Sequence, residues 1–351
     1  MIEASEPTVS SLNQGDSRAA YDAVRQGGAG LIDLSARGRI RLSGSEAVPF
    51  LNGLITNDVK ALAPGTWMTA AFPNVQGRLL AAIRVLNHGD HFLIDTEEVT
   101  HTKVWQLLER FTLAGDFHVT DLTSQTSLIS IQGAAARTVI ASKLGNAAAE
   151  VERNKITEGK TAAGIDVSVI RATHTGEEGF DLFLADPDAS RVWESLIEAK
   201  AQAVGSEVLE VLRIEAGVAR YGIDMDESNI VSETNLDEAV SFTKGCYVGQ
   251  EIIARIKYRG HVAKKLTGLI FENGLEVKPG AKILAAGKDA GRITSVTYSP
   301  ALGRPIALGY VKYDFLAPGT NVTVMQDEAE ATAQVTELPL VRGGWYQDAA
   351  S

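Results

Sequence analysis

Cysteine is almost absent from this chain of 351 residues, which has only Cys246. A single cysteine excludes an intrachain disulfide and a zinc ribbon, and it fits a reducing compartment. No apolar run reaches the roughly 18 residues that a membrane-spanning helix needs, and the N-terminal stretch lacks the basic and apolar regions of a secretion signal. The sequence therefore predicts a cytoplasmic protein that does not enter a membrane.

Positive charge and metal-binding patterns are also scarce. Lys and Arg number 33 against 44 Asp and Glu, which gives a formal net charge of −11. This balance argues against direct binding of nucleic acid or of an anionic membrane. The six histidines form no HxH or HxxxH pair, and the acidic stretch Asp224, Asp226, Glu227 lacks the ligand spacing of a calcium loop. We therefore predict no metal site and expect these three carboxylates to lie in a solvated loop.

The chain has the composition of an ordinary globular protein, with 45% apolar and 22% charged residues, and its length suits two or three domains. Strand and helix patterns alternate in two successive units, which predicts an α+β domain at 18–125 and a second one at 126–260, interleaved with the first. After residue 260, short strands alternate with Gly or Pro turns. This pattern predicts a small antiparallel β-barrel or sandwich at 261–351.

The lone cysteine lies in an unusual stretch, which is followed by the amphipathic pattern of residues 252–256. We expect Cys246 to lie just before or within the first turn of a helix. The helix N-terminus and the ammonium of Lys244 would there lower the pKa of the thiol. The alternative is a small buried hydrophobic residue, as most lone cysteines are. The predicted catalytic residues are Cys246 and Lys244, and the predicted motif residues around them are Gly245, Tyr247, Gly249, Gln250 and Glu251.

Four stretches carry a resemblance to a known family: Phe50–Val59, Gln76–Leu80, Leu212–Glu227 and Lys244–Glu251. In this order they resemble the YgfZ family of folate-binding proteins, which are relatives of the glycine cleavage T-protein, an aminomethyltransferase, and act in iron–sulfur protein maintenance. The resemblance implies two α+β domains of the ferredoxin-like or T-protein type around a central channel, followed by a C-terminal antiparallel β-barrel. It also implies tetrahydrofolate, or a derivative, as cofactor, and iron–sulfur client or assembly proteins as partners.

The same resemblance implies a folate site. In aminomethyltransferases the glutamate matching Glu215 holds the pterin ring, and one carboxylate can accept hydrogen bonds from two adjacent pterin donors. The alternative role for Glu215 is an ordinary ion pair on a helix. Asn57 and Asp58 are candidates for lining the channel, although both residue types are common at helix ends. Arg213, which precedes Glu215 on the same predicted helix, completes the predicted cofactor site.

One departure separates this chain from the T-protein. The T-protein needs an acidic residue in the strand after its Gly-Gly turn, aimed at the folate nitrogen that receives the one-carbon unit. That position falls at Ala81 here, with Ala82 beside it. We therefore predict a tetrahydrofolate-binding accessory protein for iron–sulfur enzymes, in which Cys246 ligates iron, undergoes thiol redox chemistry or attacks an electrophilic carbon. The alternatives are an aminomethyltransferase whose acid comes from elsewhere, or a folate-binding module without catalysis.

Overall fold

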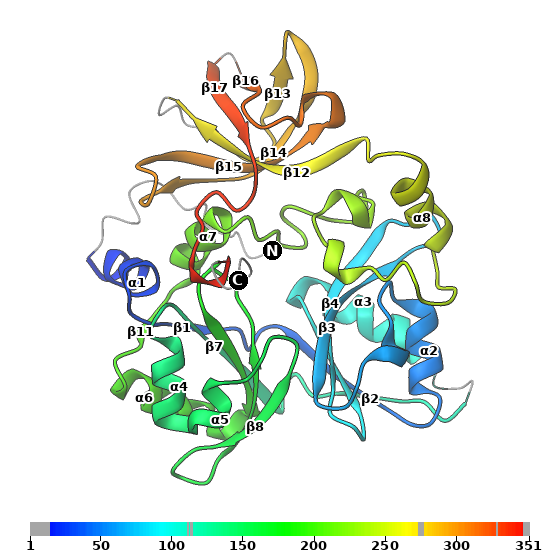
Figure 1. Ribbon diagram of the computed structural model, residues 1–351, viewed down its shortest axis with the longest axis vertical. Coiled ribbons are helices and arrows are strands. Elements are labelled where there is room, and N and C mark those ends of the chain that lie inside the picture. Colours follow the sequence, from blue (N-terminus) through cyan, green and yellow to red (C-terminus); the bar gives the residue numbers. More distant parts are fainter. Residues whose placement is uncertain (1–14, 111, 113–114, 273–276, 328, 347–351) are drawn as a thin grey trace.

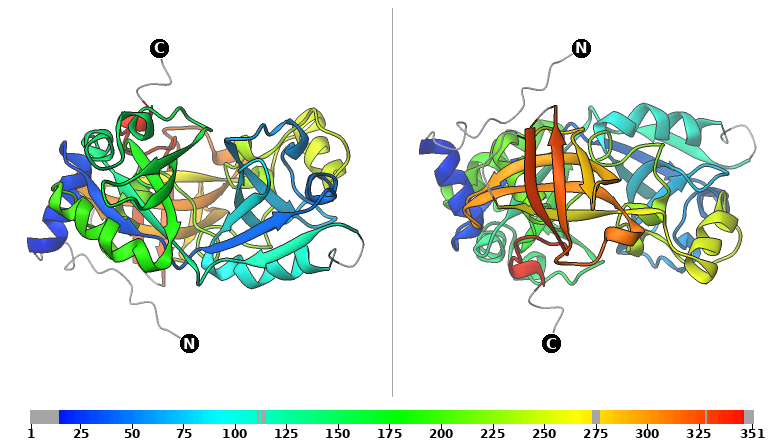
Figure 2. Two further views of the ribbon diagram at one scale, coloured as in Figure 1. Left: turned by 90° about the horizontal axis from the view of Figure 1, so that it is seen from below. Right: turned by 90° about the horizontal axis from the view of Figure 1, so that it is seen from above.

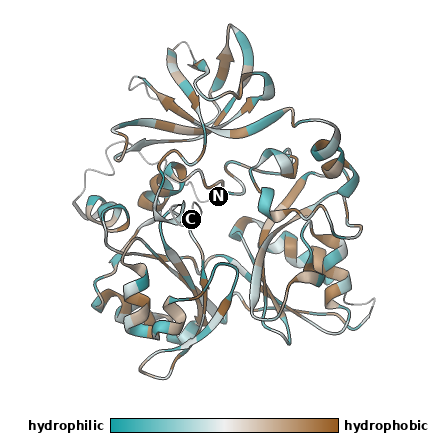
Figure 3. Ribbon diagram, viewed as in Figure 1, coloured by the Kyte–Doolittle hydropathy of each residue, from teal (hydrophilic) through white to brown (hydrophobic). Residues whose placement is uncertain are grey.

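The computed structural model describes residues 15–110, 112, 115–272, 277–327 and 329–346. Three β-sheets, each with its own hydrophobic core, form three units around the middle of the molecule (Figure 1). Hydrophobic residues run along the strands of all three sheets (Figure 3). The barrel lies across the other two units when the molecule is seen from above (Figure 2).

The first unit is a five-stranded antiparallel sheet in the order β3-β4-β5-β2-β6. Its core lies between the sheet and the helices α2 and α3, whose apolar faces supply residues such as Leu51 and Val104. The elements are β2 (Gly38–Ser43), α2 (Ala47–Leu54), η2 (Val59–Ala61), β3 (Thr66–Pro73), β4 (Leu79–Asn87), β5 (Phe92–Thr96), α3 (Glu98–Glu109) and β6 (His118–Asp121).

The second unit is a six-stranded sheet in the order β11-β1-β7-β10-β9-β8. Its elements are α1 (Gly15–Arg25), β1 (Gly30–Asp33), β7 (Thr126–Gln132), α4 (Ala136–Leu144), α5 (Asn146–Ala149), β8 (Ile156–Lys160), β9 (Asp166–Arg171), β10 (Gly179–Ala185), η3 (Asp186–Asp188), α6 (Ala189–Glu198), β11 (Gln202–Ala203) and α7 (Ser206–Glu215). Strand β1 comes from the first predicted domain range but pairs with β7 and β11. The predicted domain bounds 18–125, 126–260 and 261–351 stay a prediction.

The third unit is a closed six-stranded barrel in the order β12-β15-β14-β13-β16-β17. Antiparallel pairing of β12 with β17 closes it, so the sheet has no open edge. The elements are β12 (Lys264–Phe271), β13 (Lys282–Ala285), β14 (Lys288–Ser299), β15 (Arg304–Lys312), η6 (Tyr313–Phe315), β16 (Asn321–Gln326) and β17 (Ala329–Thr336). The predicted fold class, two α+β units and a C-terminal antiparallel barrel, is confirmed; a channel at the centre stays a prediction.

Two segments tie the units together. Residues 216–249 follow α7 of the second unit, include η4 (Val231–Glu233) and η5 (Asp237–Ala239), and pack against β3 and β4 of the first. They lead into α8 (Gln250–Arg259), which packs on the same unit. After β17 the chain returns to the second unit, where Val341 N donates to the Glu215 carbonyl and η7 (Gly344–Tyr346) follows. The predicted functional residues therefore lie where chain segments cross between units.

Candidate functional site

The lysine of the motif ties its loop to the C-terminus of α2. The Lys244 side chain is 7% exposed, and its ammonium donates to the carbonyl oxygens of Asn52 at 2.6 Å, Ile55 at 2.9 Å and Asn57 at 2.7 Å. The last carbonyls of a helix lack intrahelical donors, and a lysine is a common partner for them. Burial lowers the pKa of Lys244 to about 8, whereas the three carbonyls favour the charged ammonium.

Two further motif residues fix the loop from its other end. Tyr247 is 8% exposed and packs in a cluster with Tyr221 and Ile253, and its ring centroid lies 5.0 Å from the Lys244 ammonium. Gly249 has a φ of +77°, and a Cβ there would run into the carbonyl oxygen of Asn74. Glycine alone meets both conditions without strain. The loop is therefore clamped on either side of the cysteine.

Cys246 lies between Lys244 on one side and Tyr247 and Gly249 on the other, which hold the loop. Its side chain is exposed, and its neighbour Gly245 is exposed as well. The alternative of a buried hydrophobic cysteine is therefore wrong. Of the two predicted positions for the thiol, the structure has the one just before the helix, because α8 begins at Gln250 and its N-cap is Gly249. Dipole effects fall off within the first turn. Gln250 is half-buried and Glu251 exposed in that turn, and their roles stay predictions.

Glu215 lies at the C-terminal end of α7 and is fully buried. Its carboxylate accepts from the Tyr21 hydroxyl at 2.8 Å, from Arg25 Nε at 3.0 Å and from the Ser299 hydroxyl at 2.5 Å. The nearby carboxylate and burial together raise the pKa of Tyr21, with burial the larger cause. Through these three residues of the same chain, Glu215 joins α1, α7 and the barrel.

Arg213, the second predicted cofactor residue on α7, is 2% exposed and holds an internal ion network. It pairs with Glu210 and with Asp224. Asp224 in turn accepts from the hydroxyls of Thr294 and Ser295 on the barrel, each at 2.6 Å. The expectation of a solvated loop is wrong for Asp224, which is 2% exposed, because the barrel covers it. Asp226 and Glu227 are exposed as expected.

The two candidates after α2 are half-buried and hold local structure. The Asn57 amide donates to the carbonyl oxygens of Thr69 at 2.8 Å and Glu238 at 3.0 Å, which connects β3 to the segment near η5. Asp58 caps η2, because its carboxylate accepts from the backbone N–H of Lys60. These contacts place both residues beside the Lys244 anchor, whereas lining of a channel stays a prediction.

Two domain models of one family match successive parts of the chain. The model for the GCVT N-terminal domain matches residues 11–244, and that for the glycine cleavage T-protein C-terminal barrel domain matches residues 264–342. The chain belongs to the glycine cleavage T-protein family. Its aminomethyltransferase relative from Rubrobacter xylanophilus is 31% identical, over 93% of this chain and 86% of the relative. A probable aminomethyltransferase from Natronomonas pharaonis is 33% identical, over 92% of this chain and 90% of the relative.

A solved structure has the same fold. The glycine cleavage system aminomethyltransferase T from Bartonella henselae superposes with a TM-score of 0.82 at 23% identity, covering 92% of this chain and 89% of that one. The prediction of an accessory role in iron–sulfur enzymes is wrong, because the relatives carry the name aminomethyltransferase and the fold is theirs. The prediction of iron–sulfur client or assembly proteins as partners depended on that role and is not supported either. The predicted tetrahydrofolate cofactor agrees with this family.

The two alanines of β4 on which the predicted acidic position falls, Ala81 and Ala82, point to opposite sides of the sheet. Ala81 is fully buried in the core beneath α2 and α3. Ala82 packs with the cluster that contains Tyr221 and Tyr247. The side chain that faces the crossing segment is therefore that of Ala82, and the match of Ala81 to the acidic position of a T-protein stays a prediction. Neither methyl group can accept a proton.

An ion network between the first two sheets was not predicted. Arg84, two residues after Ala82, pairs with Asp95 of its own sheet at 2.7 Å and with Asp181 of the second sheet. Both carboxylates are fully buried, and Arg37 also binds Asp95. Nearby guanidinium groups hold the pKa of Asp95 below its ordinary value against burial, which acts in the opposite direction. The only sign of this network in the sequence was Arg84 itself, an arginine inside a largely apolar strand.

Two features, a metal-binding group and a membrane-spanning helix, were sought in the described part of the chain. In residues 15–346, apart from the few undescribed positions, no group of His, Cys, Asp or Glu could hold a metal ion. Over the same part of the chain, no helix combines the length and apolar character that a membrane crossing needs.

Proposed function

We propose that this chain binds a reduced folate and transfers a one-carbon unit, as an aminomethyltransferase. The supporting observation is the match of both family domains, in order, together with relatives about one third identical along nearly the whole chain. The family name of these relatives supports the reaction class.

Glu215 is the proposed pterin anchor. Its carboxylate is buried and lies 2.9 Å from the guanidinium of Arg25, the one cation among its partners. The remaining donors are two neutral hydroxyls, on Tyr21 and Ser299. A pterin amino group and ring N–H would replace these hydroxyls at the carboxylate, because hydroxyls can rotate to other acceptors. The ligand would then gain two charge-assisted hydrogen bonds in a site shielded from water.

The motif around Cys246 supports a narrower relationship, to the folate-binding proteins of the YgfZ family, and a role for the thiol in the chemistry. The thiol is exposed while Lys244 and Tyr247 on either side are buried. The residues on either side of the cysteine are thus held while its side chain is open to solvent. Replacing it by serine should leave folding unchanged, because the side chain is exposed, and should reduce turnover.

A second candidate function is folate binding without transfer. It is favoured by Ala81 and Ala82, because no acid stands on β4 to accept a proton from the folate nitrogen. Under this function Glu215 keeps its role and the chain carries or shields the folate.

Calorimetric titration with tetrahydrofolate, followed by an assay with aminomethylated carrier protein, tests both functions. Binding with formation of methylenetetrahydrofolate supports the transferase, and binding without turnover supports the second candidate. Glu215→Gln should weaken binding at least tenfold, about 1.4 kcal/mol or more, while Glu207→Gln, an exposed residue on the same helix, should not. No binding of tetrahydrofolate at millimolar concentration would overturn both.

A further inference from the structure

Aminomethyl transfer needs a group that accepts a proton from the folate nitrogen, and strand β4 does not supply one. Ala81 is buried in the core of the first unit, and Ala82, on the other face of the strand, is half-buried. Proton transfer by a positioned side chain typically contributes about 10²–10⁴-fold to a rate. A transferase with this strand would take its proton acceptor from another segment of the chain.

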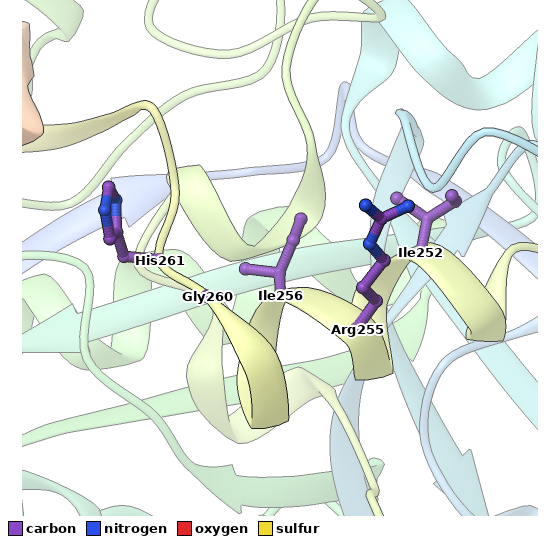
Figure 4. A pocket seen from close by; sticks show the side chains of 5 residues that line it. All are labelled: Ile252, Arg255, Ile256, Gly260 and His261. Atoms are coloured by element: carbon purple, nitrogen blue, oxygen red, sulfur yellow. The ribbon is translucent and has the colours of Figure 1, made fainter.

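Histidine is the side chain best suited to this task near neutral pH, and all six histidines lie in the described part of the chain. Among these six, only His174 pairs with a fully buried carboxylate, that of Asp181, at 3.0 Å. His261 has no carboxylate partner among the described residues and lines a hollow of about 310 Å³ along α8 (Figure 4). The other four lie beside carboxylates with 39% exposure or more: His88, His91, His101 and His118.

The pairing with Asp181 leaves one ring nitrogen of His174 available. Nε2 lies 3.1 Å and 3.0 Å from the two Asp181 oxygens. Burial acts to raise the pKa of Asp181, but His174 and Arg84 beside it hold this pKa below its ordinary value, so the carboxyl is ionised and Nε2 donates to it. Nδ1 then carries the lone pair. It forms no hydrogen bond with a described residue and is not closed off from solvent, since the side chain is 20% exposed.

On one side, the turn that carries His174 is tied to the proposed pterin anchor. Arg25 binds the Glu215 carboxylate. The same guanidinium donates to the Thr175 carbonyl oxygen at 2.9 Å and to the Glu177 carboxylate at 2.8 Å. Thr175 and Glu177 are one and three residues after His174. A pterin held at Glu215 would therefore lie beside this turn.

On the other side, the histidine–aspartate pair is tied to the face of β4 that carries Ala82. Asp181 binds Arg84 of that strand, and Arg84, two residues after Ala82, extends from the same face. Arg84 is 8% exposed, and its Nη2 atom has no hydrogen-bond partner among the described residues. A buried donor without an acceptor is costly, and it points to an acceptor atom of a ligand at this place. His174 therefore lies between the pterin anchor and the strand that lacks the acid.

We propose that His174 accepts the proton of the folate nitrogen during aminomethyl transfer, while Asp181 orients the ring and stabilises the imidazolium that forms. This role rests on the reaction proposed above. As the nitrogen bonds to the methylene carbon of the aminomethyl group, it gives its proton to Nδ1, and the bond from that carbon to the carrier breaks with its electron pair on the carrier. His174 then returns the proton to the amine, which leaves as ammonia when the second folate nitrogen closes the ring. The proton of that second nitrogen reaches the carrier through solvent.

Steady-state assays of the full chain with aminomethylated carrier protein and tetrahydrofolate test this role. His174→Gln keeps a donor for Asp181 and removes the available ring nitrogen. It should lower kcat by about 10²–10⁴-fold. Its affinity for tetrahydrofolate, measured by calorimetry, should stay within about twofold of the wild type, because only the transition state uses the proton acceptor. Imidazole at millimolar concentration should restore part of the turnover of His174→Ala, since it can take the place of the missing ring.

The matched control is His101→Gln, because His101 on α3 also pairs with an aspartate, Asp121, at 3.0 Å and is 23% exposed. This variant should keep wild-type turnover, and so should His261→Gln. Circular dichroism and thermal melting check that each variant is folded.

The possible results separate the role of His174 from the transferase function. Wild-type kcat in His174→Gln, an equal loss in His101→Gln, or no effect of imidazole on His174→Ala would overturn the role of His174 alone. Binding of tetrahydrofolate by the wild type without any turnover would instead remove the transferase function, and the role of His174 with it.

Discussion

Replacing Lys244 with methionine tests how the motif loop is held. Methionine keeps the apolar stem of the side chain but removes the ammonium, so the carbonyl oxygens of Asn52, Ile55 and Asn57 lose their shared donor. The side chain is 7% exposed, so water replaces that donor poorly. Buried acceptors without a partner are costly.

The magnitude follows from two opposing contributions. A hydrogen bond from a charged donor contributes about 1.5–3 kcal/mol, so three of them contribute several kcal/mol. Against this, burial lowers the pKa of Lys244 to about 8, so desolvation of the ammonium offsets part of this gain. The net loss in the free energy of unfolding on Lys244→Met should be about 3 kcal/mol at pH 7.

The pH dependence has a definite sign. Between pH 8 and 10.5 the folded wild type releases the Lys244 proton while the unfolded chain keeps it. The free energy of unfolding then rises with pH in this window. The difference between wild type and Lys244→Met should therefore widen as the pH is raised from 8 towards 10.

Urea denaturation, followed by tryptophan fluorescence and by circular dichroism, measures the loss. Lys60→Met is the matched control, because Lys60 is exposed in the neighbouring turn, and it should change the free energy of unfolding by less than about 0.5 kcal/mol. A loss below about 1 kcal/mol for Lys244→Met, or equal losses in the two variants, would refute the role of Lys244 as anchor.

Three other predictions concern the backbone and the buried charges. Gly249→Ala should lower the free energy of unfolding by about 2–4 kcal/mol, because a Cβ at φ +77° meets a backbone oxygen. Its control is Gly245→Ala, whose Cβ would meet nothing within 4 Å, and thermal melting should show this variant to be close to neutral. Arg84→Met should cost about 3–5 kcal/mol in urea denaturation, since it leaves Asp181 and Asp95 with one cation fewer; an unchanged midpoint contradicts this. Because the pKa of each of these carboxyls is held below 3.8 by nearby cations against burial, their stabilising contribution is complete above about pH 5 and is lost as the pH falls below 4. Wild type should therefore lose more stability than Asp181→Asn between pH 6 and pH 3.

The sequence by itself determined the fold class and the relationship to the glycine cleavage T-protein. Alternating short strands with Gly and Pro turns after residue 260 predicted the barrel, because strand period and turn chemistry are local properties. The single cysteine and its flanking glycines were visible in the sequence, as were the alanines on β4. Local pattern reports which side of an element is buried, however, and not what lies against it.

Only the tertiary structure decided the surroundings of the candidate residues. Glu215 meets Tyr21, 194 residues away, and Lys244 meets the end of α2, 192 residues away from Asn52. Strand β1 joins the second sheet, and the barrel covers Asp224. Pairings over such separations depend on how whole units pack, and the energy of any one of them is too small to leave a mark on local sequence.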